Sequence, residues 1–227
     1  MSIPDNLARI HDRIAAAALT AGRDPAEIRL VAVSKTRPAA DVLTAFQAGQ
    51  TVFGENYIQE LVPKLTEVTE PVEWHVIGHL QSNKVKYIAG EVSLIHSVDR
   101  LSLAEEIDRQ WGRLDRVCDI LIQVNISGEA SKSGTTTEEA LQLLHHCARL
   151  PHVRVTGLMT MPPFFDEPER ARPCFTALRQ LADIVTAEAI AGVSMNELSM
   201  GMSGDFEVAI QEGATLVRVG TAIFGVR

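Results

Sequence analysis

The chain has 227 residues, of which 46% are hydrophobic and 22% charged, and a formal net charge of −8 at pH 7. This balance is typical of a globular protein with one domain over residues 1–227, and no apolar run approaches the roughly 20 residues of a membrane-spanning helix. The negative charge argues against nucleic acid as a partner, because it would repel the phosphate backbone.

The N-terminal segment lacks the basic start, apolar core and cleavage site of a secretory signal. Cys118, Cys147 and Cys174 are widely spaced and form no C-x-x-C pair. We therefore expect a cytoplasmic protein with reduced thiols.

An amphipathic helix opens the chain, since Ile3, Leu7, Ile10 and Ile14 recur at helical spacing. The Gly-Arg-Asp-Pro run at 22–25 should end it.

Strand and helix patterns then alternate along the chain. Strands are expected at 30–34, 51–53, 73–77, 93–97, 118–124, 153–159, 196–200 and 215–219. Helical patterns lie at 39–48, 56–68, 82–89, 101–112, 136–149, 167–190 and 204–212, one of them opening with a capping box of Thr136 and Glu139. The alternation predicts a single (β/α)8 TIM barrel of the α/β class, preceded by the N-terminal helix. An open doubly wound sheet is the alternative, although no G-x-G-x-x-G turn follows the first strand.

Lys35 directly follows the first apolar strand. The carboxyl ends of barrel strands are where such folds place their sites, so Lys35 is a candidate for Schiff-base chemistry. A lysine at a strand end also commonly extends to solvent or pairs with a carboxylate.

Polar residues follow the last two strands as well. Ser203 with Gly204, and Gly220 with Thr221, offer hydroxyls and backbone N–H groups where barrels often bind phosphate. A plain N-cap and a plain turn are the alternatives, and Asp205 and Glu207 would oppose an anion unless they point away.

Arg218 shares one side of the last strand with Gly220, so it is expected to project into the barrel. There it would be either a member of a structural ion pair or a fixed positive charge beside a ligand. Asn56 and His79 are candidates to contact a ligand ring or to pack as satisfied polar groups. The methionines at the same strand ends, Met159, Met161, Met200 and Met202, are interpreted as packing residues.

Metal binding and serine hydrolysis have little support. His75 with His79, and His145 with His146, form no three-ligand set with a carboxylate, so no metal is expected. No G-x-S-x-G motif is present.

Seven segments in order together resemble the pyridoxal phosphate homeostasis proteins, whose fold is similar to the barrel domain of alanine racemase. The resemblance covers nearly the whole chain. The segments are VAVSKT at 31–36, FGENY at 53–57, WHVIGHLQSNK at 74–84, QVN at 123–125 with Lys132-Ser-Gly at 132–134, GLM at 157–159, LSMGMSGD at 198–205, and VRVGT at 217–221 with FG at 224–225.

This resemblance implies a role for each candidate residue. Lys35 is expected to carry pyridoxal 5'-phosphate (PLP) as a Schiff base, and Arg218 to face the pyridine nitrogen. Asn56 and His79 are expected beside the ring, and the residues expected at the phosphate are Ser203, Gly220 and Thr221. An arginine cannot give its proton to the ring nitrogen, so the ring would be a weak electron sink.

The implied function is PLP binding in intracellular vitamin B6 homeostasis, without efficient catalysis. The resemblance further implies that the second domain that completes the racemase site is missing, and we expect a monomer that delivers or buffers PLP, with apo PLP-dependent enzymes as candidate partners. The alternatives are a single-domain, racemase-like PLP enzyme with Tyr57 or His79 as acid–base group, a sugar-phosphate enzyme in which Lys35 forms a transient Schiff base, and a scaffold for PLP-dependent partners.

Overall fold

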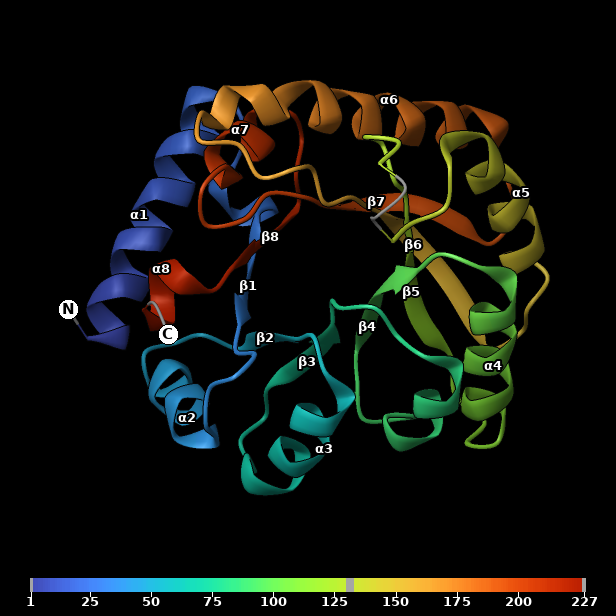
Figure 1. Cartoon of the computed structure of the whole chain (residues 1–227), viewed down its shortest axis with the longest axis horizontal. Helices are drawn as coiled ribbons and strands as arrows, with labels where there is room; N and C mark the ends of the chain where they lie inside the picture. The colour runs from blue at the N-terminus through green and yellow to red at the C-terminus, as the bar shows by residue number, and fades with distance from the viewer. Residues whose placement is uncertain (1, 130–132, 226–227) are drawn as a thin grey trace.

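Eight parallel strands close into a barrel (Figure 1), so the predicted TIM-barrel fold is confirmed. The computed structural model describes residues 2–129 and 133–225; Lys132 lies outside them. Each strand pairs with the next along the chain, and the last pairs with the first. The strands are β1 (Arg29–Val33), β2 (Val52–Glu55), β3 (Glu73–Val76), β4 (Leu94–Val98), β5 (Cys118–Gln123), β6 (Val153–Met159), β7 (Val193–Ser199) and β8 (Leu216–Val219).

Helices surround the barrel (Figure 1). The α-helices are α1 (Ile3–Thr20), α2 (Ala39–Gln47), α3 (Ile58–Glu67), α4 (Leu101–Gly112), α5 (Thr137–Cys147), α6 (Arg172–Glu188), α7 (Phe206–Gln211) and α8 (Thr221–Phe224). Three 3-10 helices are η1 (Pro25–Glu27), η2 (Ser82–Tyr87) and η3 (Pro168–Ala171). Within the described residues, no helix is both long and apolar enough to cross a bilayer.

The N-terminal helix α1 packs against the end of the chain. A capping box of Ser2 and Asp5 starts it, and its buried stripe includes Leu7 and Ile10. It runs beside α7 and α8 (Figure 1), and Asn6 Nδ2 donates a hydrogen bond of 2.8 Å to the carbonyl of Ile223. The two ends of the chain are therefore held together on one side of the barrel.

Several elements differ in detail from the predicted ones. The second strand runs on to Glu55. Gly54 lets the strand pack closely against Val31 and Ile77, since a Cβ at this position would lie 2.9 Å from each of these side chains. The helical pattern at 82–89 forms a 3-10 helix whose one buried residue is Val85, so an α-helix would gain little packing there. The pattern at 167–190 divides into η3 and α6, and α8 is an additional single turn. The predicted capping box of Thr136 and Glu139 is confirmed.

Side chains on the strands alternate between the barrel interior and the layer beneath the helices. The outward residues pack with the helices into the larger core. The interior holds a separate apolar cluster of Val31, Val52, Ile77, Leu94, Leu121, Met159 and Leu216. Buried polar side chains occupy the rest of the interior, among them His75, His96, Ser199 and Arg218.

We predict that the protein loses stability as pH falls below about 6.5, because two interior histidines resist protonation. Burial, assisted by Arg29, lowers the pKa of His75 to about 3. Burial, then His75, Arg218 and Arg29, lower the pKa of His96 well below its ordinary value. Both histidines take up protons near pH 6.5 in the unfolded chain, so acid favours unfolding; each should cost about 2 kcal/mol between pH 7 and pH 5.

Urea unfolding at the two pH values measures this loss. A His75→Asn variant should show a shallower pH dependence than the parent, because it has one fewer group that protonates on unfolding. Equal pH dependence for the two proteins would contradict the prediction.

Candidate functional site

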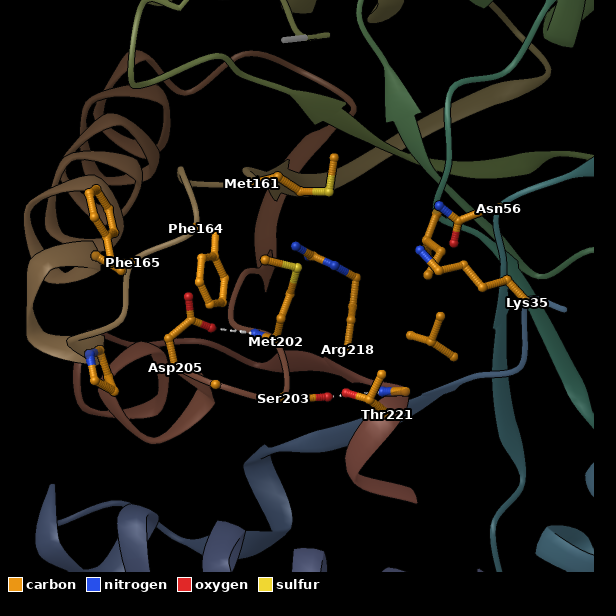
Figure 2. A pocket seen from close by; sticks show the side chains of 16 residues that line it. Lys35, Asn56, Met161, Phe164, Phe165, Met202, Ser203, Asp205, Arg218 and Thr221 are labelled. Atoms are coloured by element: carbon orange, nitrogen blue, oxygen red, sulfur yellow. Dashed lines mark hydrogen bonds between the residues drawn. The ribbon is translucent and has the colours of Figure 1, made fainter. Parts of the chain in front are cut away.

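A cavity of about 300 Å³ opens where the carboxyl ends of the strands meet. Its residues come from the segments that follow six of the eight strands and from β1 and β8 themselves. They are Val33, Lys35, Asn56, Ile77, Met161, Phe164, Phe165, Pro168, Ala171, Met202, Ser203, Gly204, Asp205, Arg218, Gly220 and Thr221. Figure 2 shows Lys35 and Arg218 extending into the same space, with Ser203 and Thr221 along one edge.

Lys35 is half-buried, and its side chain shares the inward side of the strand with Val33. In the described part of the chain its amine makes no hydrogen bond or ion pair. The next residue, Thr36, has a φ of 61°, which is costly for a β-branched side chain, and its N–H donates to Glu60 Oε2 at 2.6 Å. The strained turn lets the chain leave the barrel while the Lys35 amine stays in the cavity.

A buried ion pair fixes the backbone just before Lys35. Lys64 on α3 is 5% exposed, and its Nζ lies 2.5 Å from Glu55 Oε1 and 2.8 Å from the carbonyl oxygen of Ser34. Ser34 Oγ donates to the same carboxylate at 2.7 Å. Burial raises the pKa of Glu55, and the contacts with Lys64 and Ser34 oppose the shift. Lys64 was not among the predicted site residues, although its position three residues after Leu61, on the apolar face of its helix, indicates a buried lysine.

Arg218 is 4% exposed and faces the cavity. Its guanidinium donates to Ser199 Oγ and, at 2.9 Å, to the carbonyl oxygen of Thr160. Burial lowers the pKa of Arg218 to about 10, with Asp205 opposing, so the group remains charged at neutral pH. Neither hydrogen-bond acceptor is a carboxylate. Of the two possibilities that the sequence left open, the geometry favours a fixed positive charge beside a ligand.

The loops after β7 and β8 meet along one edge of the cavity. The backbone N–H of Gly220 donates to Ser203 Oγ at 3.3 Å, and Thr221 lies beside this contact (Figure 2). Around Gly204 the space is open, since a Cβ there would have no neighbour within 4 Å. The loops therefore leave room for an anion against hydroxyl and N–H groups.

The two acidic residues nearby are engaged elsewhere. Glu207 Oε1 accepts from Arg13 Nε at 2.7 Å. Asp205 lines the cavity, but its Oδ1 accepts from the backbone N–H of Met202 at 2.6 Å (Figure 2). Burial raises the pKa of Asp205, and the Met202 N–H opposes that shift. Neither carboxylate is therefore directed at the edge formed by Ser203 and Thr221.

Asn56 lies beside Lys35 in the cavity (Figure 2), and its buried Oδ1 has no hydrogen-bond partner. Gly78 packs against it so closely that a Cβ at that position would lie 2.5 Å from the Asn56 carbonyl oxygen. His79 is placed differently: its side chain is 53% exposed, its Nδ1 is 4.0 Å from Asp99 Oδ2, and it does not line the cavity.

Six of the seven candidate residues thus lie around one cavity: Lys35, Asn56, Ser203, Arg218, Gly220 and Thr221. The four methionines at these strand ends have two different environments. Met159 and Met200 are fully buried, as expected of packing residues, whereas Met161 and Met202 line the cavity. Beside them Phe164 and Phe165 add an apolar wall (Figure 2). Among the described residues there is no group of three or more side chains suited to hold a metal ion.

Comparison with known proteins places this barrel in a family. A family model described as the N-terminal domain of alanine racemase matches residues 6–227. The pyridoxal phosphate homeostasis protein of Aquifex aeolicus (strain VF5) is 45% identical over 228 residues, covering 100% of this chain and 99% of that protein. The protein of the same name from Escherichia coli (strain K12) is 44% identical, covering 99% of this chain and 97% of that protein. The chain belongs to the family of pyridoxal phosphate homeostasis proteins, and the resemblance drawn from its motifs is confirmed.

Solved structures agree with this placement. PipY of Synechococcus elongatus PCC7942, solved with PLP bound, is 34% identical and has a TM-score of 0.86, covering 99% of this chain and all of that chain. Alanine racemase of Clostridium difficile 630 is 16% identical with a TM-score of 0.76, and the match covers 98% of this chain and 57% of that chain. The second likeness concerns the fold alone.

We predict that Lys64→Met destabilises the protein by about 3–5 kcal/mol, because it leaves the Glu55 carboxylate buried without its counter-charge. Urea unfolding measures the free energy. The double variant Lys64→Met/Glu55→Leu should recover most of the loss, since no buried charge remains. An exposed-lysine control, Lys86→Met, should change stability by less than about 0.5 kcal/mol. A Lys64→Met protein as stable as the parent would contradict a structural role for the pair.

Proposed function

We propose that this protein binds PLP as a Schiff base on Lys35 and holds it for intracellular vitamin B6 homeostasis, without efficient amino-acid chemistry of its own. The observation that carries the proposal is the unpaired Lys35 amine in a cavity that also contains the charged Arg218. An amine that forms a Schiff base must reach the carbonyl carbon without first breaking an ion pair.

The donor groups of the cavity fit PLP. The compound carries an aldehyde, a basic ring nitrogen and a phosphate, and the cavity offers an amine, a guanidinium and an edge of hydroxyl and N–H groups. The buried amide oxygen of Asn56, without a partner, is a further place for a ligand group to bond. Met161, Phe164 and Met202 supply an apolar wall for a flat ring.

The chain's own residues divide the binding between them. The Lys35 amine would hold PLP through its aldehyde as a Schiff base, with release of one water, and the bound compound would supply an electron-accepting ring. Arg218 keeps its proton and donates a hydrogen bond to the ring nitrogen. Ser203, Gly220 and Thr221 bind the phosphate at the cavity edge.

Two features support a holding role over catalysis. The pKa of Arg218 lies well above neutrality, so the ring nitrogen receives a hydrogen bond but no proton, which weakens the electron sink that amino-acid chemistry needs. Of the described residues around the cavity, only Lys35, Asp205 and Arg218 carry titratable side chains, and Asp205 Oδ1 is held by its own loop. The acid–base candidates Tyr57 and His79 do not line the cavity.

The proposal extends to the state in which the protein works. We propose that it works as a monomer in the cytoplasm. We propose that the protein transfers its bound PLP to apo-enzymes that depend on this cofactor. A Schiff base on Lys35 suits such transfer, because it can be hydrolysed. A contact between His79 and the ring remains a prediction, because it needs His79 to turn toward the cavity.

We predict that the purified protein incubated with PLP becomes yellow, and that borohydride reduction leaves a pyridoxyl group on the peptide containing Lys35. Absorption spectroscopy and peptide mass mapping detect both. Lys35→Ala should lose the band and the adduct, whereas Lys86→Ala, which removes an exposed lysine, should keep them. A colourless, unmodified parent protein would reject the PLP assignment and favour the sugar-phosphate reading.

We also predict that the PLP-loaded protein racemises and decarboxylates amino acids no faster than free PLP. Among the described residues around the cavity, Arg218 does not give up its proton to the ring nitrogen, and the carboxylate of Asp205 is held by the Met202 N–H. Chiral chromatography of alanine and other amino acids after long incubation measures this rate. Turnover at ordinary enzymatic rates that disappears in Lys35→Ala would instead establish a single-domain racemase-like enzyme.

A further inference from the structure

A chain of hydrogen bonds runs inside the barrel below the cavity. It begins at Arg218, whose NH1 donates to Ser199 Oγ. Ser199 Oγ lies 2.8 Å from His96 Nδ1, and His96 Nε2 lies 3.0 Å from His75 Nδ1. His75 Nε2 in turn faces Glu73 Oε2 at 3.9 Å. These residues come from strands β8, β7, β4 and β3, and apart from Arg218 none of them lines the cavity.

The proton positions along this chain follow from the chemistry at its two ends. A guanidinium can only donate, so Ser199 Oγ accepts from Arg218. At the other end Glu73 Oε2 accepts a hydrogen bond of 2.6 Å from Arg29 NH2 and lies 3.9 Å from His75 Nε2, beyond hydrogen-bond distance. The negative charge of that carboxylate favours a proton on His75 Nε2, which leaves His75 Nδ1 as an acceptor. His96 must then donate from Nε2 and accept at Nδ1, and the one hydroxyl proton of Ser199 goes to His96. Each contact from Arg218 to His75 therefore has one donor and one acceptor.

Both histidines are neutral in this arrangement. Burial, then His75, Arg218 and Arg29, lower the pKa of His96, and burial, then Arg29, lower the pKa of His75. The Glu73 carboxylate beside His75 is itself paired with Arg29, whose NH2 lies 2.6 Å from Glu73 Oε2. The two rings are also 0% and 1% exposed. The chain can thus bind Arg218 without neutralising it, and the guanidinium keeps its full charge toward the cavity.

We propose that Ser199, His96 and His75 are positioning residues that hold the Arg218 guanidinium toward the cavity in one fixed proton arrangement. This proposal rests on the proposed PLP function in one respect, namely that the ligand group contacted by Arg218 is the ring nitrogen of PLP. Its physical basis is that Ser199, with its single proton committed to His96, always presents a lone pair to Arg218. Without His96 the hydroxyl is free to rotate, and Arg218 loses a fixed acceptor.

The proton arrangement is tested on the protein without PLP. Nitrogen-15 to proton correlation spectra of the imidazoles at pH 7 should show both His75 and His96 as neutral Nε2–H tautomers. Assignment comes from His75→Asn and His96→Gln samples, each of which lacks one set of signals. A proton on Nδ1 of His96, or a charged ring at either position, would overturn the proposal whatever the protein binds.

The positioning role is tested with PLP. His96→Leu should weaken PLP binding about tenfold or more, because Arg218 loses an oriented acceptor, while borohydride still labels Lys35. His96→Gln should bind within about threefold of the parent, since its amide oxygen can accept from Ser199 and its amide nitrogen can donate to His75. His11→Leu, an exposed histidine on α1, is the matched control and should bind as the parent does.

Several outcomes separate the possibilities. If folded His96→Leu protein binds PLP as tightly as the parent, the positioning role is wrong. If His96→Leu does not fold, Ser199→Ala tests the same contact from the other side and must weaken binding as well. If the parent binds no PLP, the proposed function fails, and the tautomer spectra still decide the proton arrangement.

Discussion

The pairing of β8 with β1 is the constraint on which the rest of the site depends. It sets Val31 opposite Arg218, so residues near the two ends of the chain become neighbours on adjacent strands. Lys35 and the edge formed by Gly220 and Thr221 are brought to one cavity by the same register. Packing of α1 against α7 and α8 reinforces this closure from outside (Figure 1). The Lys35 amine and the Arg218 guanidinium, from segments far apart in the chain, therefore lie in one cavity without any conformational change.

The barrel buries two cations in different ways. Lys64 lies outside the strands, on the buried face of α3, where Glu55 pairs with it and Ser34 donates to the same carboxylate. Arg218 lies inside the strands and is held by neutral acceptors alone, Ser199 and the carbonyl of Thr160. The Glu55 carboxylate neutralises the charge of Lys64, whereas the neutral acceptors leave the positive charge of Arg218 in the cavity. A cavity that keeps a positive charge beside an unpaired amine suits a ligand with a lone pair and a phosphate.

Most of the fold could be predicted because strand and helix patterns alternate regularly, and each of the eight expected strands exists. The boundaries differ from the predicted ones where the local pattern is weak. The strand β2 continues through Gly54, a residue that usually favours the end of a strand, and Val85 is the one buried residue of the 3-10 helix after β3. Six candidate site residues share one cavity for a related reason, since residues that directly follow parallel strands must meet at one end of a barrel. His79 is the exception, because it lies on a loop whose direction the strand does not fix.

The barrel, the family and the position of Lys35 at the end of the first strand could be predicted from the order of the residues alone, because they follow from periodicity and from motifs in order. Three features become visible only in the folded chain: Arg218 has no carboxylate hydrogen-bond partner among the described residues, Asp205 accepts from its own loop, and His75 and His96 form one chain with Ser199. These facts depend on contacts between strands far apart in the chain and on side-chain rotamers. A linear pattern carries neither, since burial and hydrogen bonding in a closed barrel are set by all eight strands together.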